Sequence, residues 1–456
     1  MKVSELVKLG QNALVAFDRY IVDKKIDPPI RVYIRHFTTE LEVSETDCRT
    51  QGSSEIVPKP DWSKTVFDFM EERIKSLPEF QQLGQSIATR YKKNINKLAE
   101  GCNEVSQVTF WLETFVQRLL HEKLEGKLSD DSLMEYASLF KSELELSPLE
   151  HMLVSYLDGI FLESDYIRIN DNVLIRKTRK DDLEYTTELF IDNPRPLFMG
   201  IPSSILETHT YAIDQKDCHE IVNRILDSLR LYKLGSVYRL ELVSIRGTII
   251  WPGGSVRSWG HENYSSNRKY TVKEPEVDSF IKFVNVIAEK LAFNKEEKEY
   301  RTLSISIERY RSALLESVDI DRKLMTAVMG LESIFTLERD RGENAFKLGI
   351  RVAKLLGSLG LDSQRIRKVT EDAYSYRNKV VHGSYITPEE RKKMNNLLTQ
   401  VLNYLRVSVV IFLLNQETGK DKMIDIIDQS TISPFKDEEL KKLLEEETRE
   451  IGGVLV

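Results

Sequence analysis

Three polar side chains near the end of one predicted helix form the group best suited to chemistry. Asn378 and His382 are four positions apart, so a helix places both on one face, and Arg377 lies about 100° round the helix from Asn378. Gly383 is typical of a left-handed helix stop, which places His382 in the last turn, where the helix dipole favours an imidazolium. An imidazole can both accept and donate a proton, and Arg377 offers a permanently charged fork for a phosphate or a phosphoryl transition state.

A structural role is the alternative for the same residues. A histidine before a helix-ending glycine can simply cap the last carbonyl groups, and an arginine one turn earlier can pair with a carboxylate such as Glu332 or Glu371. In that case the helix would end in a cap and contribute a dimerisation surface rather than a catalytic site.

The segment around these residues resembles a known family. Arg377 to His382 reads Arg-Asn-Lys-Val-Val-His, which matches the Arg-x4-His signature of the HEPN superfamily, and the longer string Ser-Tyr-Arg-Asn-Lys-Val-Val-His-Gly resembles its Apea-like branch. Residues 321–335, with the pair Leu-Glu ending in Glu332, look like the second helix of that branch, and residues 351–357 resemble the helix that follows. The resemblance covers roughly residues 303–414, a quarter of the chain.

This resemblance implies a metal-independent endoribonuclease without a cofactor. Two bundles would pair about a twofold axis so that both Arg-x4-His segments line one cleft, and the ribose 2′-hydroxyl would attack the adjacent phosphate. His382 would transfer protons, Arg377 would stabilise the phosphorane, and Asn378 would position the substrate or the imidazole. Helix geometry is a second reason to expect a homodimer. Arg377 and His382 are five positions apart, so they lie about 140° apart round a single helix and do not easily converge.

The resemblance also implies supporting residues and an alternative function. Glu332, an acid on an otherwise apolar helix face, is expected to pair with Arg351 or Arg377 and to hold the site in place. Many HEPN bundles are not catalytic, so the alternative is an adaptor that dimerises and binds a nucleotide or a protein. An active ribonuclease would be toxic, so its role is expected to be conditional, as in prokaryotic antiviral defence (abortive infection) or a toxin-like stress response.

The elements that must position these residues are helices with apolar spacings of three and four. Residues 296–416 predict a compact HEPN-like bundle of about four or five helices, and Thr387-Pro-Glu-Glu predicts a capping box between Thr387 and Glu390. Residues 417–456 are expected to form a tail with one short helix from Asp437 to Ile451.

The preceding residues predict an α+β region, so the fold class is α+β and predominantly helical. Residues 1–160 are expected to be mostly helical, with helices continuing from about Ser63 to Leu157. Residues 161–295 alternate β-branched and aromatic residues, which predicts strands at 166–170 and 173–176, a helix at 218–231 and a strand pair within 237–250. This region is expected to sense a protein or nucleic-acid trigger and to restrain the bundle.

Composition excludes several classes of protein. The chain has 456 residues and a net charge of −7, but residues 300–416 carry 19 Lys and Arg against 13 Asp and Glu, which suits a polyanion such as RNA, although an uneven solvated surface is equally compatible. No apolar run approaches the roughly 20 residues of a membrane span, and no secretory signal is visible, so a cytoplasmic protein is expected. Three scattered cysteines exclude a disulfide framework or a structural zinc ribbon.

Other motifs are weaker. His219-Glu and His261-Glu lack the second histidine of a zincin helix, and the sequence contains no phosphate-binding glycine loop. The aromatic residues Trp259, His261 and Tyr264 beside Arg257 could stack an unpaired base or grip a protein, but they are more typical of a loop anchor. The run Arg176-Lys-Thr-Arg-Lys could touch nucleic acid, although a charged strand exit followed by a helix cap at Thr178 or Asp181 is the favoured interpretation.

Overall fold

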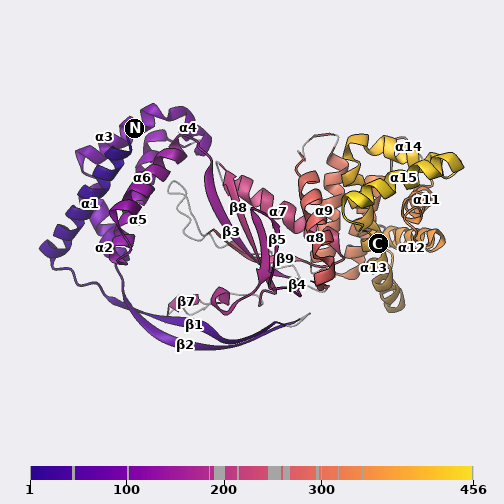
Figure 1. The fold of residues 1–456 in the computed structure, drawn as a ribbon, viewed down its shortest axis with the longest axis horizontal. Coiled ribbons are helices and arrows are strands. Elements are labelled where there is room, and N and C mark those ends of the chain that lie inside the picture. The colour runs from indigo at the N-terminus through magenta and orange to yellow at the C-terminus, as the bar shows by residue number, and fades with distance from the viewer. Residues whose placement is uncertain are drawn as a thin grey trace.

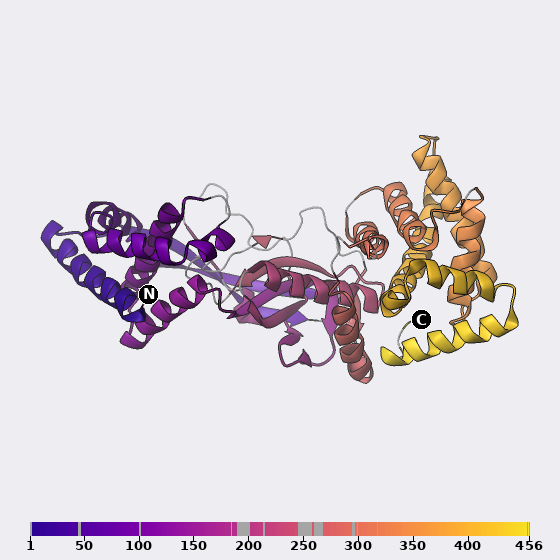
Figure 2. The same ribbon diagram turned by 90° about the horizontal axis from the view of Figure 1, so that it is seen from above.

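The protein is elongated, with a helical lobe and a helical bundle at opposite ends of a central sheet (Figures 1 and 2). The computed structural model describes residues 2–43, 47–99, 102–183, 185–188, 201–212, 215–244, 258–259, 268–293, 297–298, 300–316, 318–340, 342–453 and 455. It confirms the predicted class, a predominantly helical α+β protein with a C-terminal helical bundle.

The N-terminal lobe packs six helices around aromatic side chains. Its helices are α1 (Val3–Lys24), α2 (Ser63–Phe69), α3 (Pro78–Arg90), α4 (Lys92–Leu98), α5 (Glu104–Leu124) and α6 (Asp130–Leu144), with a π-helical turn at Met70–Ile74. Trp111 is fully buried, and the rings of Phe115 and Phe140 lie 5.8 Å apart. Within the described chain, the buried apolar residues of this lobe form a cluster separate from the rest of the protein.

A long β-hairpin extends from the lobe below the sheet (Figure 1). Strands β1 (Ile30–Val43) and β2 (Cys48–Pro60) pair antiparallel, and β7 (Tyr185–Glu188) adds a short third strand to β1. Ile30 and Ile56 are exposed, so the ribbon buries little apolar surface at these positions. The sequence analysis did not predict this hairpin.

In the described chain, six strands form the central sheet in the order β10-β9-β3-β8-β6-β5. Their bounds are β3 (Leu149–Asp158), β5 (Tyr166–Asn170), β6 (Val173–Lys177), β8 (Ser204–Ala212), β9 (Tyr238–Ser244) and β10 (Ser258–Trp259). A parallel pair, β4 (Ile160–Leu162) with β11 (Tyr270–Val272), lies beside this sheet, and a 3₁₀ turn Lys180–Leu183 follows β6. Helix α7 (Gln215–Tyr232) packs on β3 and β8, and α8 (Val277–Lys290), after a 3₁₀ turn Glu274–Glu276, packs on β5.

The structure confirms some predictions for this region and corrects one. The antiparallel hairpin of β5 and β6 and the helix α7 occur where they were predicted, whereas the rest of the strand pair expected after Ser244, residues 245–250, lies outside the described residues. The prediction that helices continue to Leu157 was wrong, because residues 149–158 form β3 at the centre of the sheet. Leu153, Val154 and Ser155 are consecutively buried, and a strand buried on both faces lacks the alternation that distinguishes it from a helix.

The C-terminal part is a helical bundle built around one long helix. It consists of α9 (Arg301–Leu315), α10 (Ile320–Phe335), α11 (Asn344–Gly357), α12 (Ser363–Val381), α13 (Pro388–Leu414), α14 (Lys420–Ser430) and α15 (Pro434–Glu450), with a 3₁₀ turn at Gln416–Thr418. Among the described helices, α13 is the one whose length and apolar character would suffice to cross a membrane. Its most apolar window is 78% buried inside the protein, as expected for the central helix of a bundle.

The bundle and the central sheet share one apolar core. The described core residues run from Leu153 in β3 to Leu455 near the end of the chain, so this core crosses the boundary expected near residue 295. The Tyr310 hydroxyl donates a hydrogen bond to the carbonyl oxygen of Arg230, and buried Arg406 donates to the carbonyl oxygens of Leu231 and Leu455. The last forty residues form two packed helices rather than the single tail helix that was expected, and they close the bundle.

Candidate functional site

The candidate residues lie at the end of α12, and local sequence determines where that helix begins and ends. The Asp362 carboxylate accepts hydrogen bonds from the backbone N–H groups of Gln364 and Arg365, which caps the helix at its start. At the other end, Gly383 has φ of +66° and its N–H donates to the Val380 carbonyl at 3.1 Å, while the next N–H closes the turn onto Lys379. The predicted glycine stop is confirmed.

Arg377 is partly buried and held from three sides. Its Nη2 lies 3.3 Å from Oε2 of Glu332 on α10, and its Nη1 donates to Oδ1 of Asn378 at 3.0 Å. The guanidinium carbon lies 5.6 Å from the ring centre of Tyr374, one turn earlier on the same helix. The Nε atom is buried and makes no hydrogen bond to any described residue, so one donor of this guanidinium is unused.

Glu332 therefore pairs with Arg377, one of the two partners expected for it. Its carboxylate also lies near Tyr374, whose pKa is raised by burial and, to a lesser extent, by the negative charge of Glu332. Tyr374 was not predicted as a site residue, although its position three residues before Arg377 would have allowed the ring and the guanidinium to meet on one helix face.

His382 is exposed at the C-cap of α12. Its backbone N–H donates to the Asn378 carbonyl, but its imidazole makes no hydrogen bond to a described residue. The ring does not bond the last helical carbonyls, which is what a purely capping histidine would do. The side chains of Val381 and Tyr385 beside it are 52% and 82% exposed, so the histidine stands in an exposed, partly apolar surface.

Arg351 belongs to a different cluster of charges. It is buried and donates hydrogen bonds to Asp340, to Asp428 on α14 and to the Phe335 carbonyl, whereas Glu332 is not among its partners. The ion pair lowers the pKa of Asp340 to about 2 despite the burial of that carboxyl, and its carboxylate partners raise the pKa of Arg351. The structure thus separates Arg351 from Arg377, although the sequence grouped both with Glu332.

A groove of about 460 Å³ lies between α12 and α13, next to the candidate residues. Neither Arg377 nor His382 lines it. The lining residues are Asp372, Ser375, Tyr376 and Lys379 of α12 and Lys393, Asn396 and Leu397 of α13. Lys379 forms an ion pair with Glu390 at 2.6 Å, which raises the pKa of the lysine and, together with the Thr387 N–H, lowers the pKa of Glu390 to about 2.

The start of α13 is fixed as predicted. The Glu390 N–H donates to the Thr387 hydroxyl at 3.2 Å, and the Thr387 N–H donates to the Glu390 carboxylate at 2.9 Å, so the expected capping box is confirmed. Glu390 thereby joins the cap of α13 to Lys379 on α12, and this contact orders the connection that carries Gly383.

The basic run after β6 has a structural role. Arg176 is buried and pairs with Asp182 and Glu207, each at 2.6 Å, and these partners raise its pKa. The turn that follows is capped by Asp182, which accepts from the Arg179 N–H, and not by Thr178 or Asp181 as expected. Thr178 instead donates to the Pro202 carbonyl.

The aromatic loop named in the sequence analysis is not part of the described structure. Arg257, His261 and Tyr264 lie outside the described residues, and Trp259 is described only as backbone in β10. Their contribution to a binding surface stays a prediction.

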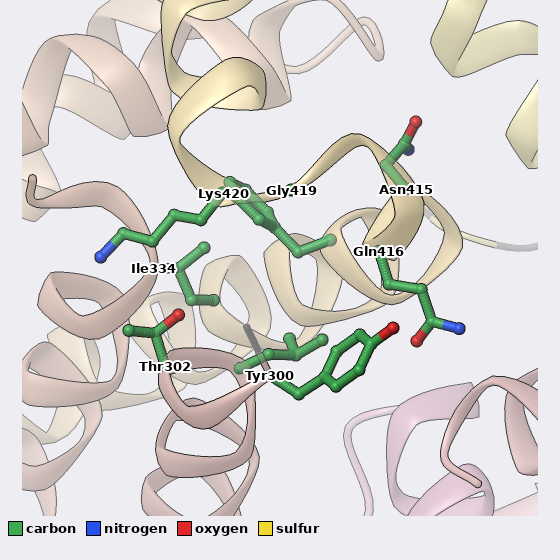
Figure 3. A pocket seen from close by; sticks show the side chains of 9 residues that line it. Tyr300, Thr302, Ile334, Asn415, Gln416, Gly419 and Lys420 are labelled. Carbon is green, nitrogen blue, oxygen red and sulfur yellow. The ribbon is translucent and has the colours of Figure 1, made fainter. Parts of the chain in front are cut away.

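A second cavity lies at the start of α14 but is too small for a substrate. Figure 3 shows Tyr300 and Thr302, from the start of α9, facing Gly419 and Lys420 across it. Its volume is about 20 Å³, which accommodates a single water molecule. Burial lowers the pKa of Lys420.

Comparisons with known proteins give no matching family model, no similar curated protein and no similar solved structure. The chemistry of the site must therefore be argued from its own residues.

Proposed function

We propose that the protein is a metal-independent endoribonuclease of HEPN type. The observation that carries this proposal is an exposed imidazole, free of hydrogen bonds to described residues, at the end of the helix that holds a partly buried guanidinium with an unused donor. A group that served only to cap the helix would be expected to bond the carbonyls, and a purely structural guanidinium would be expected to use all its donors.

The proposed reaction is a transesterification followed by release of the product. The ribose 2′-oxygen forms a bond to phosphorus while its proton passes to a base, and the bond from phosphorus to the 5′-oxygen breaks as that oxygen takes up a proton. The products are a 2′,3′-cyclic phosphate and a 5′-hydroxyl. In this proposal His382 moves the protons, Arg377 stabilises the phosphorane oxygens, and Asn378, which accepts a hydrogen bond from Arg377, keeps the guanidinium oriented.

The proposed active unit is a homodimer. His382 and Arg377 lie about 140° apart round α12, so the imidazole of one chain would act beside the guanidinium of another. The exposed side chains of Val381 and Tyr385 offer apolar surface for such an interface. The groove between α12 and α13, with Lys379 and Lys393, would then carry the RNA backbone away from the cleaved phosphate.

The proposed role in the cell is conditional. Uncontrolled RNA cleavage in the cytoplasm would stop growth, so we infer that the N-terminal lobe and the central sheet restrain the bundle until a protein or nucleic-acid trigger binds. The shared core of sheet and bundle provides a physical route for that restraint. Antiviral defence or a toxin-like stress response fits this arrangement.

The test is cleavage of labelled RNA by the full-length protein in the presence of EDTA. We expect cleavage products with a 2′,3′-cyclic phosphate end, and we expect Arg377→Ala and His382→Ala to abolish them. Arg367→Ala is the matched control for Arg377, because Arg367 lies on the same helix and pairs with Glu371 on the surface. Cleavage by the parent that both site variants retain at the same rate would overturn the proposal.

An inhibited parent needs a second assay, performed in cells. Expression should slow growth and fragment RNA, and His382→Ala should relieve both effects at equal protein level. Full-length protein is required here, because truncation at residue 296 would cut through the shared core and remove the Leu231 and Tyr232 carbonyls that accept hydrogen bonds from Arg406. Growth inhibition that persists in His382→Ala would count against a nuclease.

A non-catalytic adaptor is the second candidate, and one observation favours it. Arg377 already has a carboxylate partner in the isolated chain, Glu332, as a structural arginine would. An adaptor predicts that the parent, Arg377→Ala and His382→Ala are equally inert towards RNA while dimerisation persists. Sedimentation analysis of the three proteins alongside the cleavage assay separates the two functions.

A further inference from the structure

Another large cavity lies on the side of α13 away from the groove between α12 and α13, where the bundle meets the central region of the chain. It has a volume of about 440 Å³ and is bounded by α9, α10 and α13 and by Arg268, which precedes β11. Its apolar wall includes Leu314, Leu398 and Leu402, and its polar groups are Arg268, Lys323 and Asn395. This volume is within the range of ~300–1,000 Å³ typical of small-molecule sites.

The two cations of this cavity lack carboxylate partners. Arg268 donates from Nη2 to the Thr399 hydroxyl at 2.7 Å, and within the described part of the chain neither Arg268 nor Lys323 forms an ion pair. Both side chains are partly buried, and burial lowers the pKa of each. The positive charge of Arg268 lowers the pKa of Lys323 further, whereas the negative charge of Glu316, which forms no ion pair with this lysine, raises it to a smaller extent.

Several other partly buried cations of the described chain are paired with carboxylates, although buried Arg406 bonds main-chain carbonyl oxygens instead. Lys233 pairs with Glu276, Arg311 with Asp227 and Lys354 with Asp437, all at 2.7 Å or less. Against these pairs, two neighbouring cations that form no ion pair with a described residue, on the wall of an open cavity, indicate that an anion from outside the chain completes the site.

We propose that this cavity binds a small organic phosphate, such as a nucleotide. The phosphate would lie between the Arg268 guanidinium and the Lys323 ammonium, and Asn395 and Thr399 would supply further hydrogen bonds. The apolar wall formed by α9 and α13 would hold the organic part of the ligand. A free inorganic anion would use the cations alone and leave that wall exposed to water.

Bound ligand would act on the helix that also borders the proposed RNA groove; this step alone rests on the proposed function. Asn395, Leu398 and Leu402 of α13 line the ligand cavity, while Lys393 and Asn396 of the same stretch line the groove beside α12. A ligand that fixes this stretch of α13 therefore changes one wall of the groove. The cavity is then a regulatory site, and the organic phosphate is its effector.

Binding is tested without any cleavage assay, by titration calorimetry on the full-length protein with AMP, ATP, adenosine and inorganic phosphate as probes. We expect AMP or ATP to bind, inorganic phosphate to bind more weakly and adenosine to show no binding. Lys323→Gln and Arg268→Gln should each weaken binding at least tenfold. Arg322→Gln is the matched control, because Arg322 is an exposed neighbour that does not line the cavity.

Two results would overturn the assignment. The first is absence of binding by every phosphate probe, or binding that Lys323→Gln and Arg268→Gln leave unchanged. The second is that Lys323→Gln and Arg268→Gln weaken the binding of a short single-stranded RNA but not the binding of AMP or ATP. That result would make the cavity part of the RNA surface. A measured nucleotide affinity combined with an inert Arg377 site would instead reject the nuclease and keep this proposal.

Stability of the ligand-free variants gives an independent readout. Because Lys323 is partly buried beside Arg268 and forms no ion pair with a described residue, Lys323→Gln should leave the unfolding midpoint unchanged or raise it in the absence of ligand, and should abolish the increase that ATP produces in the parent. A lowered midpoint in ligand-free Lys323→Gln would show that the lysine has a structural partner, and would contradict the proposal.

Discussion

Two arginines in the same bundle have opposite surroundings. Arg351 is buried at the junction of α11 and α14, and its donors reach two carboxylates and a main-chain carbonyl. Arg377, on α12, has one carboxylate at 3.3 Å, one neighbouring amide and an Nε atom without a described partner. All the hydrogen-bond donors of Arg351 are thus used within the fold, whereas the Nε donor of Arg377 is not.

Under the proposed function, this difference in hydrogen bonding distinguishes a structural arginine from a catalytic one more clearly than sequence does. Both arginines occur in helices of the segment that resembles HEPN proteins, and both were grouped with Glu332. A fully bonded, buried cation contributes to folding and has no donor left for a substrate, while a partly bonded one can change partners at low cost. Variants of the two clusters should therefore differ in which property they lose.

We call Arg351 with Asp340 and Asp428 the closed cluster, and Arg377 with Glu332 and His382 the open cluster. The largest expected effect is on stability at the closed cluster. Arg351→Met should lower the free energy of unfolding by about 3–5 kcal/mol, because it leaves the buried carboxylate of Asp340 without its cation. Arg377→Met should lower it by less than about 1 kcal/mol, since its ion pair with Glu332 is partly exposed. Urea denaturation of both variants measures the contrast, and equal losses would mean that the two clusters do not differ as described.

The next effect is on activity at the open cluster. His382→Gln should reduce RNA cleavage by at least about 100-fold, because general acid–base catalysis typically contributes ~10²–10⁴-fold, while stability should change by less than about 0.5 kcal/mol. His121→Gln is the control, because His121 is an exposed histidine in the last turn of α5. Measured rates for both variants decide the matter: loss of cleavage in His121→Gln, or retained cleavage in His382→Gln, would contradict a catalytic histidine.

The closed cluster should also make stability depend on pH. The folded pKa of Asp340 is about 2, below its ordinary value of 3.8, so this carboxylate stabilises the protein fully above about pH 4 and loses its contribution as the pH falls towards 2. The loss should amount to about 2 kcal/mol. Asp340→Asn should remove this part of the acid dependence, whereas Asp425→Asn, which affects a surface pair with Arg339, should leave it in place. Denaturation midpoints measured between pH 2 and 5 test both statements.

Sequence predicted the helices with regular apolar spacing and missed the elements whose pattern is ambiguous. The bundle helices α9 to α13 repeat apolar residues at three and four, and they agree with the four or five helices predicted for residues 296–416. Strands β1 and β2 were missed because a solvated ribbon has no strongly apolar face, and β3 was mistaken for a helix because it is buried on both faces. The short helix α14 was also missed, although Met423, Ile424 and Ile427 are buried in it.

The same limit applies to the site. Local features were predicted, namely the helix stop at Gly383, the capping box of α13 and a carboxylate partner for Arg377, because each depends on residues a few positions apart or on facing helices. The partners of Arg351 could not be predicted, since Asp428 lies 77 positions away on a helix that the sequence did not reveal. The cavity beside Lys323 was missed for the same reason, because Arg268 reaches it from outside the bundle.

The smallest expected effect tests whether the turn at Gly383 positions His382 for cleavage. Gly383 has φ of +66° with open space around its Cβ position, so Gly383→Ala should cost about 1 kcal/mol through backbone strain alone. Gly126 ends α5 in the same way, with φ of +71° and equally open surroundings, so Gly126→Ala should lose a similar amount of stability. Only Gly383→Ala should also reduce RNA cleavage, because it shifts His382, the residue directly before it. Unfolding and cleavage measurements on both variants distinguish backbone strain from a change in the orientation of His382. A similar small loss of stability in both, with unchanged cleavage, would mean that the position of the imidazole does not depend on this turn.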